Sequence, residues 1–234
     1  MKLGIMQPYF FPYIGYFSLI NYCDKFVFFD TPQYIRKGWV NRNRFVRADG
    51  QVDYFTVPVE KCARETPINQ VMIDNALPWK EKIYGQFTAY KKRAPFYNQV
   101  VELLRDVLET DVKISDLSIE SIVKASEYIG IDTSFETFST MDLAIGEVQE
   151  ADEWALQITK AMQYPIYVNP PGGKEFFHKE KYTNAGIELQ FLAPELKQYN
   201  QKRGHFEPGL SIIDLMMFLS PEEIREMLKY YVIS

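Results

Sequence analysis

The chain has 234 residues, of which 47% are hydrophobic and 24% are charged, and its formal net charge is −5 at pH 7. This is the composition of a globular protein, and it excludes a disordered or collagen-like chain. The acidic balance also argues against a general nucleic-acid binder, whose domain usually carries a basic excess.

Short apolar runs argue against a membrane protein. The longest runs, such as 26–29 and 215–219, are far below the roughly 20 residues that span a bilayer, so we expect no membrane span. Gln7 and Pro8 interrupt the apolar stretch that follows Lys2, which disfavours a signal peptide. The expected compartment is therefore the cytoplasm.

The few cysteines and histidines limit the chemistry of the chain. Cys23 and Cys62 have no second Cys or His nearby, which argues against a disulfide framework and a structural zinc site. His178 and His205 are too few for a three-histidine metal site, and a Ser-His-Asp triad would need one of them. We therefore predict no metal ligand.

The first 30 residues predict a β-loop-α-β unit. Residues 3–6 are a short buried strand that Pro8 ends, residues 15–21 are a helix, and residues 26–29 are a second strand ending at Asp30. Such a unit implies two parallel strands joined by a right-handed crossover, which places the chain in the α/β class.

The rest of the chain continues with short strands and amphipathic helices. The expected strands are 45–46, 54–57, 71–73, 166–168 and 187–192, and the expected helices are 78–92, 96–108, 119–129, 153–162, 174–184, 212–219 and 221–231. Because no repeat or linker interrupts them, we expect a single α/β domain over 1–234. It has a helical insertion around 78–130 and a C-terminal helical pair at 211–231.

Polar side chains follow three of the predicted strands. Gln7, Asp30 and Asn169 each come directly after a strand, and ligands of open α/β sheets bind beyond the carboxyl ends of the strands. Turn chemistry explains the Asp and the Asn equally well when each is taken singly. Together the three residues favour a ligand site.

Aromatic residues are unevenly distributed. They make up 15% of the chain, and eleven of them lie within the first 34 residues. Tyr9, Tyr13, Tyr16, Tyr34 and Trp39 cluster around the first strand ends and the basic segment, so we expect them at a binding site. The phenylalanines of the strand at 26–29 are expected in the core.

Segment 33–47 contains five basic residues and no acidic residue in a chain of negative net charge. Guanidinium groups suit phosphate or carboxylate, Asn adds directional donors, and Tyr or Trp stacks on a base or sugar ring. The alternative is a solvated basic loop. The candidate binding residues are Gln33, Tyr34, Arg36, Trp39, Asn41, Arg42, Asn43 and Arg44.

Segment 169–174, Asn-Pro-Pro-Gly-Gly-Lys, lies between a predicted strand and a predicted helix. A Walker A loop would need Gly at Val168 and Ser or Thr at Glu175, so this segment is not one. Gly172 and Gly173 let a ligand approach the backbone, with Lys174 at the helix start, although glycines also serve ordinary turns.

Two further features lie near the C-terminal end. Ser211 and Asp214 match a capping box, which we interpret as structural. His205 lies in a polar loop as a candidate general base, and the alternative is a solvent-exposed side chain without a role.

Several separated motifs resemble the WbqC-like protein family. They are residues 7–17 (Gln-Pro-Tyr-Phe-Phe-Pro-Tyr-Ile-Gly-Tyr-Phe), the block 30–43, residues 167–174, and Leu-Ser-Ile-Ile-Asp at 210–214. Members resemble proteins found beside genes for O-antigen and other surface polysaccharides. The resemblance covers essentially the whole chain and implies a role in making or modifying an activated sugar.

The first motif also resembles, distantly, the opening of nucleotidylyltransferases, in which a strand, a loop with proline, a glycine turn and a helix bind ATP. Its turn is Tyr13-Ile14-Gly15-Tyr16 here, and the paired histidines of that superfamily are missing. The resemblance implies a Rossmann-like sheet with helical additions. It also implies a nucleotide such as ATP as a cofactor, whereas adenylyl transfer by the usual route is not expected.

The first functional hypothesis is an enzyme of surface-polysaccharide biosynthesis that transfers an acyl or aminoacyl group to the amine of a nucleotide-linked amino sugar. Arg36, Arg42 and Arg44 hold the diphosphate in this hypothesis, and Asp30 or His205 accepts the proton of the attacking amine. The alternatives are a nucleotidyl- or glycosyl-transferring enzyme and a non-catalytic nucleotide-sugar binding module. The expected partner is a nucleotide-linked sugar or another anionic small molecule, and a homodimer is compatible with the sequence.

Overall fold

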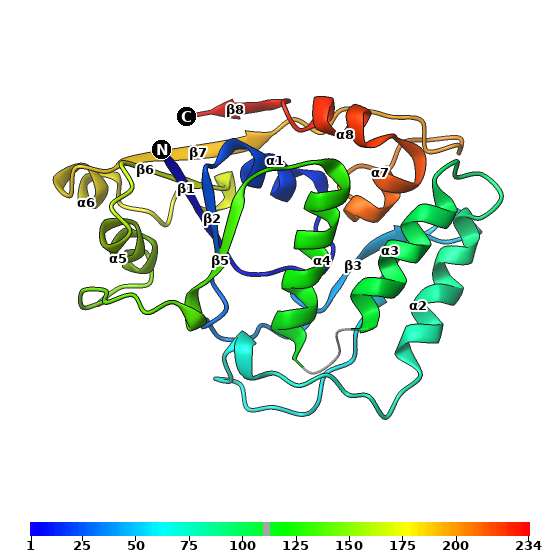
Figure 1. Cartoon of the computed structure of the whole chain (residues 1–234), viewed down its shortest axis with the longest axis horizontal. Coiled ribbons are helices and arrows are strands. Elements are labelled where there is room, and N and C mark those ends of the chain that lie inside the picture. The colour runs from blue at the N-terminus through cyan, green and yellow to red at the C-terminus, as the bar shows by residue number, and fades with distance from the viewer. Residues whose placement is uncertain (110–112) are drawn as a thin grey trace.

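A six-stranded sheet with the order β5-β2-β1-β6-β7-β8 forms the centre of the computed structural model, which describes residues 1–109 and 113–234 (Figure 1). The first five strands in that order pair in parallel, and β8 pairs with β7 in the antiparallel direction. The strands are β1 (Lys2–Met6), β2 (Lys25–Phe28), β5 (Ser134–Thr137), β6 (Ile166–Asn169), β7 (Glu188–Pro194) and β8 (Tyr231–Ile233). The predicted Rossmann-like α/β class is confirmed.

Helices cover both faces of this sheet: α5 and α6 lie to the left of the strands in Figure 1, and α1 and α4 lie to the right. The helices are α1 (Ile14–Tyr22), α2 (Trp79–Phe87), α3 (Tyr97–Glu109), α4 (Ile114–Ile129), α5 (Glu153–Ala161), α6 (Lys179–Asn184), α7 (Ile212–Phe218) and α8 (Pro221–Met227). Among the described residues, none of the helices has the length and apolar character needed to cross a membrane.

The core consists of two clusters of side chains, one on each face of the sheet. Leu3, Ile5 and Val27 point toward α5 and α6 in one cluster, and Phe26 and Phe28 join α1 and α4 in the other. Successive side chains of a strand point to opposite faces, so a parallel sheet buried on both faces needs apolar residues at every position. This requirement explains the unbroken apolar run at 26–29.

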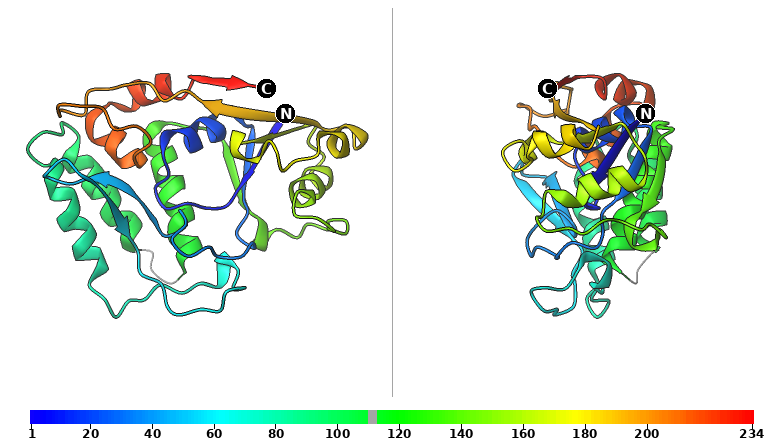
Figure 2. Two further views of the ribbon diagram at one scale, coloured as in Figure 1. Left: turned by 180° about the vertical axis from the view of Figure 1, so that it is seen from behind. Right: turned by 90° about the vertical axis from the view of Figure 1, so that its left-hand side faces the viewer.

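A two-stranded hairpin lies outside the main sheet. Its strands β3 (Arg42–Val46) and β4 (Val52–Thr56) pair in the antiparallel direction, and β4 contacts α2. Figure 2 shows the hairpin in light blue beside the helices α2 and α3. The hairpin matters for the site because its first strand carries Asn43 and Arg44.

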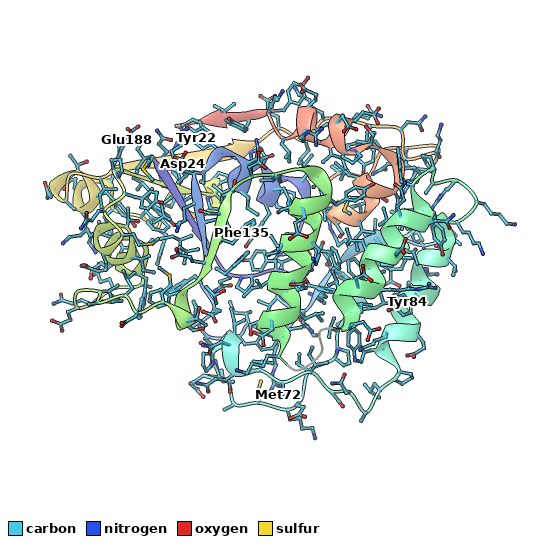
Figure 3. The ribbon with its side chains drawn as sticks, viewed as in Figure 1. Tyr22, Asp24, Met72, Tyr84, Phe135 and Glu188 are labelled. Carbon is cyan, nitrogen blue, oxygen red and sulfur yellow. The ribbon has the colours of Figure 1, made fainter. Side chains whose placement is uncertain are left out.

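The amino-terminal edge of the sheet is occupied by polar groups that pair with one another. Tyr22, Asp24 and Glu188 lie there together (Figure 3). Tyr22 donates a hydrogen bond of 3.0 Å to Gln190 Oε1, and the carboxylate of Asp24 accepts one from the backbone N–H of Lys2. The polar groups at this edge thus bond to one another. The cavity described below lies at the opposite edge, where the strands have their carboxyl ends.

Several predicted elements differ from the structure, among them the helix expected over 78–92, which ends at Phe87 and is followed by a 3₁₀ turn. Residues 71–73 form only isolated bridges, through Met72 and Ile73, because no continuous strand lies beside them in the part of the chain that the structure describes. The helix expected over 174–184 is limited to α6, because the chain first makes a 3₁₀ turn and then packs Phe177 on Tyr167. The helix expected over 119–129 begins five residues earlier, at Ile114, and ends at Ile129 as predicted, with Gly130 after it in the left-handed conformation.

Two strands were not predicted from the sequence. β5 is a short edge strand of mostly polar residues, and β8 has three residues and follows a helix that ends at Met227 rather than at 231. Part of the expected helical insertion around 78–130, residues 110–112, lies outside the described residues.

Candidate functional site

The strand order places a topological switch point between β1 and β6. From β1 the chain passes to β2 and β5 on one side of the sheet, and it then returns to β6 and β7 on the other side. Ligands of open α/β sheets bind outside the carboxyl ends of the strands at such a point. A ligand site is therefore expected where β1, β6 and β7 end.

A cavity of about 460 Å³ lies at this place. It is lined by Met6, Tyr9, Pro12, Tyr13, Gly15, Tyr16, Leu19, Trp39, Asn43, Arg44, Pro170, Pro171, Gly172, Leu192, Pro194, Leu196 and Gly209. We name it the switch-point cavity. The aromatic motif, the basic segment and the glycine-rich turn that the sequence singled out all contribute to its wall.

The aromatic motif divides into cavity residues and core residues. Tyr9 and Tyr13 line the switch-point cavity, whereas Phe10 and Phe11 are fully buried in the core. Phe11 has a φ of 41°, in the left-handed region that bulky residues rarely adopt. Ser121 Oγ accepts a hydrogen bond of 3.0 Å from the Phe11 N–H, and Ser211 Oγ donates one of 2.7 Å to its carbonyl. These contacts hold the strained turn that directs the tyrosines to the cavity.

The three phenols of the cavity are hydrogen-bond donors rather than bases. Burial raises the pKa of Tyr9, Tyr13 and Tyr16, and the proximity of Tyr13 adds to the rise at Tyr9. Tyr16 donates a hydrogen bond of 2.9 Å to the carbonyl oxygen of Gln7. All three side chains therefore stay neutral near pH 7, and Tyr9 and Tyr13 offer their O–H groups to acceptors in the cavity.

Helix α1 begins at the cavity. Tyr13 is its N-cap residue, and no side chain caps its first turn. The first N–H groups of a helix lack intrahelical acceptors and carry the positive end of the helix dipole, which suits an anion. A Cβ atom added to Gly15 would lie 2.5 Å from Tyr13 Cε2 and 2.6 Å from Pro194 Cγ, so glycine permits the close approach of α1 to the end of β7.

Arg44 supplies the formal charge of the cavity wall. None of the other lining residues, all of which belong to the described part of the chain, is an acid or a base with a charge at pH 7. Arg44 Nη2 donates hydrogen bonds to the carbonyl oxygens of Pro208, at 3.2 Å, and Gly209, at 2.6 Å. Glu207 Oε1 lies 4.0 Å from Arg44 Nη1 but is not among the lining residues, so the wall itself carries one cation and no carboxylate, a combination that favours an anionic ligand.

Trp39 and Asn43 border the cavity on the side of the hairpin. Trp39 is 41% exposed, and its ring lies 6.3 Å from that of Tyr54, which the guanidinium of Arg42 covers at 4.3 Å. Asn43 is buried, and its Nδ2 donates a hydrogen bond of 3.2 Å to the Phe10 carbonyl. Trp39 offers a stacking surface, and Asn43 fixes the aromatic motif against β3.

The turn after β6 contributes prolines and a glycine to the cavity wall, and no charged side chain. Gly172 lines the cavity, whereas a Cβ on Gly173 would meet Asn169 Nδ2 at 2.3 Å. Asn169 is buried, and its Oδ1 accepts a hydrogen bond of 2.8 Å from Tyr167. Lys174 Nζ lies 3.4 Å from the hydroxyl of Ser234. Asn169 and Lys174 are therefore engaged with the protein itself and do not line the cavity.

The rest of the basic segment lies elsewhere. Gln33, Tyr34 and Arg36 line a separate hollow of about 640 Å³. Burial raises the pKa of Tyr34 to about 12. Asn41 is buried and donates a hydrogen bond of 2.7 Å to the Val57 carbonyl, and Arg42 donates hydrogen bonds to the carbonyls of Lys37 and Gly38. Of this segment, Trp39, Asn43 and Arg44 thus line the switch-point cavity.

The two candidate general bases also lie outside the cavity wall. Asp30 is 2% exposed, and its carboxylate accepts hydrogen bonds from the N–H and the hydroxyl of Ser139, which ties the segment after β2 to the segment after β5. His205 is exposed and lines a hollow made by its own loop, together with Arg203. The side chain of Gln7 does not line the cavity, although the residue before it does.

The apolar side of the cavity was not predicted from the sequence. Leu192, Pro194 and Leu196 come from the end of β7, and Gly209 comes from the loop that leads to α7. Apolar residues carry no chemical signature, so the sequence did not single out this side of the cavity.

The interpretation of Asp214 as a capping residue is wrong. Ser211 does cap α7, by accepting a hydrogen bond from the Ile213 N–H, but the Ser211 N–H donates to the Arg44 carbonyl. The buried carboxylate of Asp214 instead accepts hydrogen bonds from the side chains of Tyr90, Tyr199, Gln201 and Arg203. The Asp214 carboxylate thereby connects α7 with Tyr90, after α2, and with the loop that contains residues 199–203.

Comparison with known proteins gives a family but no solved structure. A family model described as the WbqC-like protein family matches residues 7–226. The uncharacterized protein Rv1507c of Mycobacterium tuberculosis is 25% identical over 225 residues, which cover 94% of this chain and 95% of that protein. No solved structure matches significantly. Since the family match extends over nearly the whole chain and agrees with the resemblance of its motifs, the chain belongs to the WbqC-like protein family.

Proposed function

We propose that the chain binds a nucleotide-linked sugar in the switch-point cavity and acts on it in surface-polysaccharide biosynthesis. One observation carries this proposal. A cavity at the carboxyl ends of the parallel strands combines aromatic walls, the amino terminus of α1 and a single cation, Arg44, without any carboxylate among its lining residues.

Each part of such a ligand has a counterpart in the cavity. The phosphate groups are held by Arg44 and the first turn of α1, and the phenols of Tyr9 and Tyr13 donate to phosphate or sugar oxygens. Trp39, at the mouth, stacks on the base or the sugar ring. The volume of about 460 Å³ falls within the usual range of small-molecule sites, roughly 300–1,000 Å³.

The reaction we propose is transfer of an acyl or aminoacyl group to the amine of the bound sugar. A bond forms between the amine nitrogen and the acyl carbon, the bond from that carbon to its leaving group breaks, and the amine proton goes to the leaving group or to water. Because the lining phenols stay protonated, the contribution of the cavity is orientation and hydrogen bonding rather than proton abstraction.

A non-catalytic binding module is the second candidate. It is favoured by the location of Asp30 and His205, neither of which lines the cavity. In that case the chain senses or presents a nucleotide-linked sugar to another protein.

Calorimetric titration followed by mass spectrometry tests these proposals. Nucleotide-linked amino sugars are titrated into the wild type, Arg44→Met and Arg47→Met, an exposed arginine on the same hairpin that does not line the cavity. We expect binding to the wild type and Arg47→Met and strong weakening in Arg44→Met. Equal weakening in both variants, or no binding by any nucleotide-linked sugar, would refute the site.

The same ligands are then incubated with acyl donors and ATP. A product with the mass of the acylated amino sugar supports transfer, and binding without any product supports the binding module. A nucleotide-linked sugar formed from a sugar phosphate and a nucleoside triphosphate would assign nucleotidyl transfer instead.

A further inference from the structure

A second cluster of polar side chains lies apart from the residues that line the switch-point cavity. Glu150 and Asp152 belong to the segment between β5 and α5, and His178 is the residue directly before α6. One ligand atom of each residue, two carboxylate oxygens and an imidazole nitrogen, lies within 4.8 Å of the other two. The segments after two strands of the sheet therefore converge on one point.

Asp152 is the fixed member of this cluster. It is 3% exposed, and the hydroxyl of Tyr182 donates a hydrogen bond of 3.2 Å to its backbone carbonyl. Its Oδ1 accepts a hydrogen bond of 3.1 Å from Lys181 Nζ, whereas its buried Oδ2 has no hydrogen-bond partner among the described residues. A buried carboxylate oxygen without a partner is costly and calls for a donor or a cation.

The charges of the cluster do not balance. The ammonium of Lys181 lies within hydrogen-bond distance of three carboxylates, those of Glu150, Asp152 and Glu153. Three negative groups and one positive group leave a formal charge of −2 when His178 is neutral. One divalent cation would neutralise this charge and satisfy Asp152 Oδ2.

We propose that Glu150, Asp152 and His178 bind a divalent transition-metal ion of the Zn²⁺ type. Imidazole together with carboxylate suits zinc, whereas magnesium and calcium prefer sites made of oxygen atoms alone. Metal–ligand bonds of about 2.1 Å place the ligand atoms of a tetrahedral site about 3.4 Å apart. Because the ligand atoms already lie within 4.8 Å of one another, at most a small movement of the exposed side chains of Glu150 and His178 toward Asp152 is needed.

The ion would join two segments that follow parallel strands. His178 ends the same segment whose beginning, Pro170 to Gly172, lines the switch-point cavity. A metal at His178 therefore ties the wall of the cavity to the start of α5. The proposal stands on this cluster alone and does not depend on the ligand of the cavity.

Zinc titration of untagged, full-length protein tests the site, after treatment with EDTA and dialysis. We expect one Zn²⁺ per chain, and Mg²⁺ bound at least about 10-fold more weakly. His178→Ala and Glu150→Gln should each weaken zinc binding by at least about 10-fold. His205→Ala, which removes the other exposed histidine, should bind zinc like the wild type. Zinc binding that is absent, or that His205→Ala reduces as much as His178→Ala does, would overturn the proposal.

The variant Lys181→Met distinguishes a metal site from a network of ion pairs that binds no metal. Removal of the competing ammonium should tighten zinc binding, and zinc should raise the melting temperature of this variant by more than that of the wild type. If the cluster is only an ion-pair network, Lys181→Met has a lower melting temperature that zinc does not change. Because Glu150 and His178 are exposed, their variants report on the metal even if Lys181→Met folds poorly.

Discussion

Arg44 Nη2 donates a hydrogen bond of 2.6 Å to the carbonyl oxygen of Gly209, so the cation of the switch-point cavity is held by a loop 165 residues farther along the chain. The Pro208 carbonyl accepts a second hydrogen bond from the same nitrogen, and the buried Nε of Arg44 has no partner among the described residues. Both terminal nitrogens of the guanidinium are therefore held by the protein, since Arg44 Nη1 lies 4.0 Å from Glu207 Oε1.

Arg44→Lys should fail to restore binding of the anionic ligand. Lysine keeps the charge but lacks the planar guanidinium that bonds the loop and the ligand at once. We expect Arg44→Lys and Arg44→Met to bind about 10- to 100-fold more weakly than the wild type. Calorimetry at two salt concentrations checks this, and an Arg44→Lys variant with wild-type affinity would show that charge alone suffices.

Gly15→Ala should distort the cavity. The added methyl group would lie 2.5 Å from the ring of Tyr13 and 2.6 Å from the ring of Pro194, and the proline ring cannot turn away. We expect a loss of about 1–3 kcal/mol of unfolding free energy in urea denaturation, together with weaker ligand binding. Gly204→Ala is the matched control, because no atom lies within 4 Å of its added Cβ and Gly204 does not line the switch-point cavity. Equal stability of the two variants would contradict the close approach of α1 to β7.

The sequence predicted the four inner strands of the main sheet and missed its two edge strands, β5 and β8. Residues 26–28, 167 and 168 are buried in the middle of the sheet, where burial demands apolar residues. β5 contains Ser134, Glu136 and Thr137 because it lies at an edge and pairs only with β2. β8 was also missed in the sequence, because its three residues become a strand only by pairing with β7 in the folded chain.

The candidate site was predictable only where the backbone itself is unusual. Prolines and glycines flank Tyr9 and Tyr13, which marked an irregular segment after a strand, and both residues line the cavity. The partners of a polar side chain are set by tertiary packing, so Asp214 matched a capping pattern although its carboxylate bonds Tyr90 and Arg203 instead. For the same reason, residue types and spacing placed Asp30 at a strand end but did not predict that its carboxylate accepts hydrogen bonds from Ser139.

Asp214→Asn should destabilise the protein more than the loss of any one of its neighbours. Burial raises the pKa of Asp214, and the hydrogen bonds from Tyr199 and Tyr90 and the charge of Arg203 oppose that rise. The Arg203 side chain is only 6% exposed, and its Nε and Nη1 have no partner among the described residues. Loss of the carboxylate would leave a buried cation unpaired.

We expect Asp214→Asn to lower the free energy of unfolding by about 3–5 kcal/mol and Tyr199→Phe by about 1–2 kcal/mol, as measured in urea. Asp106→Asn, on the exposed side of α3, should change it by less than about 0.5 kcal/mol. A cost for Asp214→Asn no larger than that for Asp106→Asn would show that the network adds no stability.

Cys23 should make the protein sensitive to alkali. Burial raises the pKa of its thiol from 9.0 to about 12, and the nearby Lys2 only partly opposes this rise. The folded protein keeps the proton while the unfolded chain releases it, so the contribution of the thiol to stability is complete below pH 9.0 and is lost as the pH rises toward about 12.

Cys23→Ala removes this contribution. In that pH window we expect the unfolding free energy of the wild type to fall more steeply than that of Cys23→Ala, by about 1.4 kcal/mol per pH unit, which corresponds to one proton. Urea denaturation at half-unit steps from pH 8 to pH 11 measures both slopes. Below pH 9.0 the unfolding free energies of the wild type and Cys23→Ala should differ by a constant amount, because the thiol is then protonated in both the folded and the unfolded state. Parallel curves throughout would mean that the thiol ionises as readily in the folded protein as in the unfolded chain.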